Sequence, residues 1–84
     1  MTEKALVEIF VPAAAETFDV YIPLACKIGQ ILPLAAAALS DLSQGKFLAD
    51  QDTVLCDRNT GSILDVDMEA AELGIHNGSR LMLI

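Results

Sequence analysis

The chain has 84 residues, of which 54% are apolar and 20% are charged, and its formal net charge is −7 at neutral pH. A chain of this length has room for one modest hydrophobic core, so we expect a single domain over residues 1–84. The acidic balance disfavours contact with phosphate backbones, and we expect no binding to nucleic acid. The longest apolar run, residues 31–39, is far shorter than the roughly 20 residues that cross a bilayer, so we expect no insertion into a membrane.

The first part of the chain predicts a β-hairpin. Residues 5–11 and 17–22 both alternate between apolar and other side chains, as half-buried strands do. A few residues with Pro12 at their start separate the two runs, and proline cannot donate to a strand ladder. The side chains that we expect to face inward are Val7, Ile9, Val11, Phe18, Val20 and Ile22, and those that we expect to face outward include Phe10 and Tyr21.

A helical period replaces the alternation after Lys27 and ends at Gly45. Neither Cys26 nor Lys27, at the expected start, is a preferred N-cap residue. Pro33 lies inside the pattern, where we expect a kink or an offset first turn. The stripe that we expect to face the core contains Ile28, Ile31, Ala35, Ala38, Leu39 and Leu42.

The second half predicts several short elements. Phe47 and Leu48, in the connection after the helix, are expected to lie under the helix end. We then expect a strand, a turn, a short strand, a short helix, a tight Asn-Gly turn and a last strand. These are residues 53–57, 58–61, 62–66, 68–74, 77–78 and 79–84.

This order of elements predicts an α+β fold of the β-grasp (ubiquitin-like) type. The helical crossover allows the first and last strands to lie side by side as a parallel pair in the middle of the sheet. We expect a mixed sheet of four to five strands, one long helix packed across it and a short helix before the last strand. Leu81 and Leu83 should then face the helix, because the apolar end of the chain is part of the core.

The segments "VEIFV", "TFDVYIP", "TVLCD" and "LGIHNGSRLMLI" resemble the ubiquitin pattern over nearly the whole chain. The long helix, the "CDRNTG" turn and "ELGIHNGSRLMLI" are more similar to bacterial ubiquitin-like proteins of the YukD/EsaB type, which are associated with type VII (ESX-like) secretion. The resemblance implies a non-enzymatic interaction module, a cytoplasmic accessory component near a membrane secretion complex. Its partner would be a protein component of the secretion system.

Conjugated relatives and sulfur carriers of this fold end in a flexible Gly-Gly tail, whereas this sequence stops at Ile84. If the sequence is complete, we expect neither conjugation nor sulfur transfer. The alternative is a truncated ubiquitin-like modifier or sulfur carrier.

Residues that could support catalysis or metal binding are few. His76 has no evident nucleophile or second ligand, and Cys26 and Cys56 have no metal-binding spacing. We expect two reduced, largely buried thiols. Asp65 and Asp67 alternate with other residues but lack the frame of a calcium loop. We therefore expect no catalytic residue, no metal and no cofactor.

Ubiquitin-like proteins commonly bind partners through the exposed face of the sheet, and the resemblance aligns Leu55 and Ile84 with the centre of that face. Strand alternation adds Met82 between them, with Phe10 at a secondary edge. These four residues form the predicted protein-binding surface. The alternatives are isolated exposed apolar residues, which are common, and a weak homodimer that uses the same surface.

Overall fold

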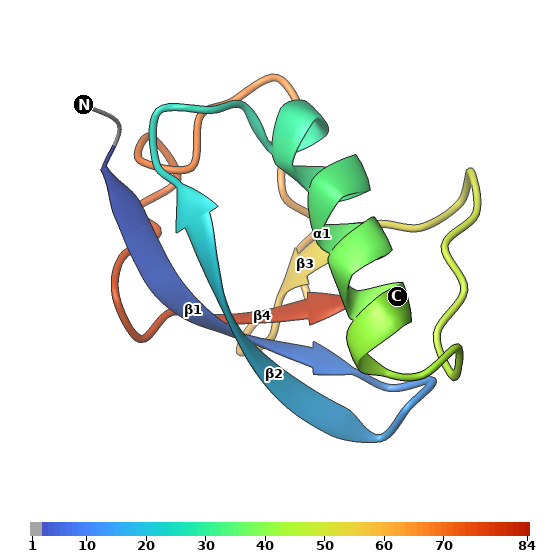
Figure 1. Cartoon of the computed structure of the whole chain (residues 1–84). Helices are drawn as coiled ribbons and strands as arrows, with labels where there is room; N and C mark the ends of the chain where they lie inside the picture. The colour runs from blue at the N-terminus through green and yellow to red at the C-terminus, as the bar shows by residue number, and fades with distance from the viewer. Residues whose placement is uncertain (1–2) are drawn as a thin grey trace.

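The computed structural model describes residues 3–84 as a four-stranded mixed sheet with one helix packed across one face (Figure 1). The strand order is β2-β1-β4-β3, in which β1 and β4 are parallel and the other pairs are antiparallel. This α+β arrangement is the β-grasp fold predicted from the sequence. The elements are β1 (Lys4–Val11), β2 (Glu16–Pro23), α1 (Ile28–Leu42), β3 (Leu55–Asp57) and β4 (Arg80–Leu83).

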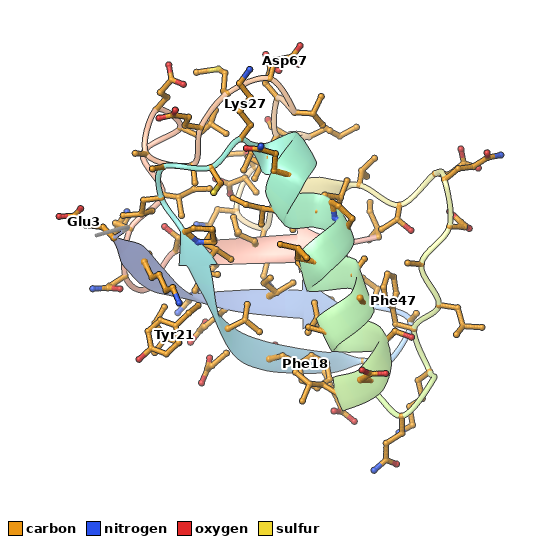
Figure 2. The ribbon with its side chains drawn as sticks, turned by 45° about the horizontal axis from the view of Figure 1, so that its top comes forward. Glu3, Phe18, Tyr21, Lys27, Phe47 and Asp67 are labelled. Carbon is orange, nitrogen blue, oxygen red and sulfur yellow. The ribbon has the colours of Figure 1, made fainter. Side chains whose placement is uncertain are left out.

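The core lies between the inner face of the sheet and one side of α1. Alternation along β1 and β4 buries every second side chain, and both Leu81 and Leu83 face the core as predicted. Phe47 lies beside α1 (Figure 2) and is also buried. The largest buried members of the core are Val7, Ile9, Val11, Ile22, Ile28, Ile31, Leu39, Phe47, Leu55, Ile75, Leu81 and Leu83.

The start of α1 is held by backbone groups of a distant loop. The N–H groups of Ile28 and Gly29 donate to the carbonyls of Met68 and Val66, both at 2.9 Å. These bonds satisfy two of the free amides at the helix start, which explains why Lys27 suffices at the N-cap position. A Cβ at position 29 would lie 3.1 Å from the Val66 carbonyl oxygen, so the loop approaches this closely because residue 29 is glycine.

The helix differs from its prediction in which residues are buried. It runs without interruption from Ile28 to Leu42 with Pro33 inside it. Ala38 and Leu42, which were expected to face the core, are exposed, and Ala36 is buried instead. Leu48 is also exposed, at 73%, so the expectation that it lies under the helix end is wrong.

Two predicted elements do not form in the described chain. Residues 62–66 make only an isolated bridge between Ile63 and Cys56 in place of a fifth strand. Residues 68–74 form successive turns rather than a helix. Their amides are used elsewhere, because the N–H groups of Ala70 and Ala71 donate to the segment that precedes α1. Gly74, at φ +79°, then turns the chain away.

The prediction that Leu55 faces outward is wrong. Leu55 is opposite Leu83 in the ladder between β3 and β4, so its side chain lies on the helix side of the sheet, where it is 1% exposed. Cys56 is opposite Met82 and lies on the other face. The strand has only three residues, so its alternation is a weak signal, and a shift of one position inverts its two faces.

No helix within residues 3–84 combines the length and apolar character needed to cross a membrane.

Replacement of Leu55 by alanine should lower the free energy of unfolding by about 2–5 kcal/mol, because it removes buried methyl groups and leaves a cavity. Replacement of the exposed Leu48 by alanine should change it by no more than about 0.5 kcal/mol. Urea unfolding followed by circular dichroism measures both values. Equal stability of the two variants would contradict the placement of Leu55 in the core.

Candidate protein-binding face of the sheet

The face of the sheet opposite α1 carries a cross-strand row of apolar side chains. Phe10 of β1 is in register with Met82 of β4, and Met82 is in register with Cys56 of β3. Neighbouring side chains on one face of a sheet contact each other, so this row is a continuous strip. We call the surface made by Glu8, Phe10, Arg58, Arg80, Met82 and Ile84 the outer face.

Arg58 covers part of this strip. Its guanidinium carbon lies 4.5 Å from the centre of the Phe10 ring, in the geometry of a cation–π contact. Its backbone N–H donates to the carbonyl of Arg80 at 3.0 Å, which ties the start of the turn after β3 to β4. Phe10 is half-buried as a result, and the exposed part of its ring borders a positive charge.

The second cross-strand row is charged. Glu8 is in register with Arg80, and the two side chains form an ion pair at 3.5 Å. Both groups are well exposed, so the pair adds little to stability. The pair matters because of where it lies. Both arginines of this acidic chain, Arg58 and Arg80, are on the outer face. The outer face therefore joins apolar groups with two arginines, of which Arg80 is paired with Glu8.

Ile84 extends the apolar strip towards the end of the sheet. Its N–H donates to the carbonyl of Val54 at 3.0 Å, and its carbonyl accepts from the Val54 N–H at 2.7 Å. These two bonds hold the backbone in line with β4 and leave the Ile84 side chain 48% exposed. Beside it lies a groove of about 370 Å³ whose lining includes the exposed Leu48.

The structure thus brings three of the four predicted residues, Phe10, Met82 and Ile84, onto one face, and Leu55 does not join them. Sequence reasoning missed Arg58 and Leu48. The Arg58 contact depends on the turn after β3, and the position of Leu48 depends on an irregular connection. A sequence pattern could have indicated neither, because both residues lie outside periodic segments.

His76 has a serine neighbour that the sequence did not suggest. Its Nδ1 lies 3.3 Å from the hydroxyl oxygen of Ser79 and 2.9 Å from the carbonyl oxygen of Gly74. A carbonyl oxygen only accepts, so Nδ1 carries the proton in that contact and cannot take one from Ser79. The Ser79 hydroxyl oxygen also accepts the His76 backbone N–H at 2.9 Å. The pair stabilises the turn before β4 and lacks the geometry of a nucleophile and its base.

The two thiols differ in environment. Both cysteines are free, with Cys26 half-buried and Cys56 1% exposed. Burial raises the pKa of the Cys56 thiol above its ordinary value of 9.0, because an apolar surrounding disfavours the thiolate. Cys56 is therefore neutral near pH 7 and is a poor nucleophile.

The acidic residues before β4 serve local structure. The Asp65 carboxylate accepts the N–H of Asp67 at 2.9 Å, which closes a small turn. Across residues 3–84 no three histidine, cysteine or acidic side chains gather as a set of metal ligands.

Alkylation with iodoacetamide at neutral pH should modify Cys26 before Cys56, because Cys56 is both buried and protonated. Mass spectrometry of peptides from timed samples measures the two rates, and the same reaction in urea provides the control in which both should react alike. Equal rates in the folded protein would show that Cys56 is accessible, and would contradict its position under the outer face.

The chain was compared with protein families and with curated proteins. The family model for protein YukD of the WXG100 protein secretion system (Wss) matches residues 6–83. A search of curated protein sequences gives no match.

Several solved structures share the fold. The ubiquitin-like domain of the Mycobacterium tuberculosis type VII secretion system protein EccD1 is 19% identical with a TM-score of 0.79, and the match covers 98% of both chains. The EccD5 ubiquitin-like domain from Mycobacterium xenopi is 17% identical with a TM-score of 0.81, covering 98% of this chain and 93% of that one. A chain of the MycP5-free ESX-5 inner membrane complex is 13% identical with a TM-score of 0.80. There the match covers 96% of this chain and 20% of the larger one.

Proposed function

Because this chain belongs to the YukD family of the WXG100 protein secretion system, we propose that it is a non-enzymatic docking module of a type VII-like secretion apparatus. It binds a protein component of that apparatus through the outer face of its sheet. It acts in the cytoplasm, as an accessory component beside the membrane complex.

The observation that carries this proposal is the composition of the outer face. Phe10, Met82 and Ile84 offer an apolar contact area on rigid strands, and Arg58 and Arg80 border it. Apolar anchors at the centre of an interface supply most of its affinity, whereas charged groups at the rim set orientation and association rate. A partner with an apolar anchor and neighbouring acidic groups fits this surface.

The fold of the related secretion proteins supports the same role. A domain with this fold is present in a chain of the ESX-5 inner membrane complex, as part of a longer protein. We propose that the domain of the present chain is held to the apparatus by contacts between surfaces.

The environments of His76 and Cys56 favour docking over catalysis. The His76 Nδ1 is engaged by a carbonyl, and the Cys56 thiol is buried with a raised pKa. The Nδ1 of His76 therefore cannot take a proton from Ser79, and the neutral Cys56 thiol is a poor nucleophile.

The proposal does not involve a C-terminal carboxyl group. Ile84 exchanges two backbone hydrogen bonds with Val54, so the residues up to Ile84 belong to the sheet. A covalent adduct of this chain with another protein, detected by mass spectrometry in cells that produce it, would contradict the proposal.

Replacement of Ile84 by aspartate should reduce binding to the secretion apparatus about tenfold, because it buries an unpaired charge in the apolar strip. The measurement uses the chain with an N-terminal affinity tag, produced in its source cells, with cross-linking and quantitative mass spectrometry of the recovered secretion components. Met82→Ala removes an adjacent contact and should also weaken recovery.

The matched control is Leu42→Asp. Leu42 is 54% exposed, close to the 48% of Ile84, but lies on α1 on the opposite side of the sheet. This variant should recover as much of the apparatus as the unchanged chain, and thermal unfolding verifies that all variants fold. Recovery of no secretion component, or equal losses in Ile84→Asp and Leu42→Asp, would overturn the proposed function.

A further inference from the structure

The β2 strand forms an edge of the sheet whose outward backbone groups have no partner in the described part of the chain. The Leu24 N–H donates to the Glu3 carbonyl at 2.9 Å, which marks these opposed residues as a hydrogen-bonded pair. Such pairs alternate in an antiparallel ladder, so Phe18, Val20 and Ile22 direct their backbone groups towards β1. Thr17, Asp19 and Tyr21 direct theirs away from the sheet.

The hydrogen bonds that β1 makes on its other side, away from β2, agree with this alternation. The Leu6 N–H donates to Asn77 Oδ1 at 2.8 Å, and the Glu8 N–H donates to the Ser79 carbonyl at 2.9 Å. These residues oppose Tyr21 and Asp19 in the register, so they are the ones that direct their groups away from β2. The hydrogen bonds on both sides of β1 therefore agree that Thr17, Asp19 and Tyr21 of β2 direct their backbone groups away from the sheet.

The second edge of the sheet is protected differently. The segment after the turn at Gly61 returns along β3, where the Asp57 N–H donates to the Ser62 carbonyl and the Leu64 N–H donates to the Leu55 carbonyl, both at 2.9 Å. Residues 62–64 thus cover the outer edge of β3. Proteins usually cover, shorten or interrupt an edge strand, whereas β2 has eight residues and its only proline, Pro23, is at its end.

A groove follows this open edge on the helix side. It has a volume of about 140 Å³ and lies between β2 and α1, with Val20 and Ile22 on one wall and Leu34 and Ala38 on the other. Leu34 is 69% exposed. The small Ala38 side chain leaves room beside the strand, so side chains of an added strand could fill the groove. Tyr21 points away from α1 (Figure 2) and leaves this side open.

We propose that the β2 edge binds an extended segment of a partner protein, which pairs with Thr17, Asp19 and Tyr21 as an additional strand. Main-chain hydrogen bonds would supply affinity, and every second side chain of the segment would enter the apolar groove. The site is distinct from the outer face, so this inference does not depend on the proposed function.

Charge indicates the chemistry of the segment. The chain carries a net charge of −7, and Asp19 projects from the other side of β2. A segment that alternates apolar with basic residues would place its apolar side chains in the groove and its basic ones beside Asp19. A second copy of this chain is a poor occupant, because pairing would bring together two domains that each carry −7.

The test uses a phage-displayed library of short random peptides, selected on the unchanged protein. Enriched peptides should alternate apolar and basic residues, and a synthetic example should slow amide hydrogen exchange at Thr17, Asp19 and Tyr21. N-methylation of alternate backbone nitrogens in that peptide should weaken binding about tenfold, because it removes main-chain donors. Leu34→Glu should weaken binding by a similar factor, whereas Ile63→Glu, at a 66% exposed residue beside β3 on the other edge of the sheet, should have no effect.

Three results would overturn the inference. The first is the absence of any peptide enriched on the unchanged protein relative to Leu34→Glu. The second is equal affinity for the normal and N-methylated peptides. The third is a concentration-dependent dimer in sedimentation experiments that Leu34→Glu abolishes, since the edge would then be occupied by a second copy. Loss of outer-face binding in Ile84→Asp would leave all three results unchanged, so the two proposals fail separately.

Discussion

The parallel pairing of β4 with β1 is the contact on which the rest of the structure depends. It places β4 between β1 and β3, so the backbone of β4 is paired on both sides. Because successive side chains alternate between faces, the same short strand sends Leu81 and Leu83 into the core and Met82 to the outer face. One strand therefore holds the core together and supplies the centre of the candidate binding surface.

The two faces of the sheet have different roles. The inner face forms the core, and the outer face is the candidate binding surface. The inner face is closed by α1, whose first amides are satisfied by the carbonyls of Val66 and Met68. On the outer face Phe10 and Met82 are partly exposed and Ile84 is exposed, and the internal contacts include Arg58 over Phe10 and the ion pair of Glu8 with Arg80. The edge of β2 is a third surface, with free backbone groups in place of apolar side chains. A domain of this size can thus offer two separate surfaces for contact.

Strand alternation and helical period were sufficient to predict the order of the main elements, the fold and the inward direction of Leu81 and Leu83. They failed where the periodic signal was short. In β3, three residues long, both Leu55 and Cys56 are buried, so alternation could not decide which one faces α1. Residues 68–74 have helical propensity, but the amides of Ala70 and Ala71 bond to the segment before α1, a long-range contact that no local pattern encodes. The Arg58 contact with Phe10 likewise depends on tertiary structure.

Amide hydrogen exchange, measured residue by residue by NMR, tests the central position of β4 most directly. The account predicts slow exchange at Leu81, Met82 and Leu83 of β4, because their amides face the neighbouring strands β1 and β3. It predicts alternation in β2, with slow exchange at Phe18 and Val20 and fast exchange at Thr17 and Asp19. Fast exchange throughout β4, or uniform protection along β2, would contradict a sheet with β4 at its centre and β2 at an open edge.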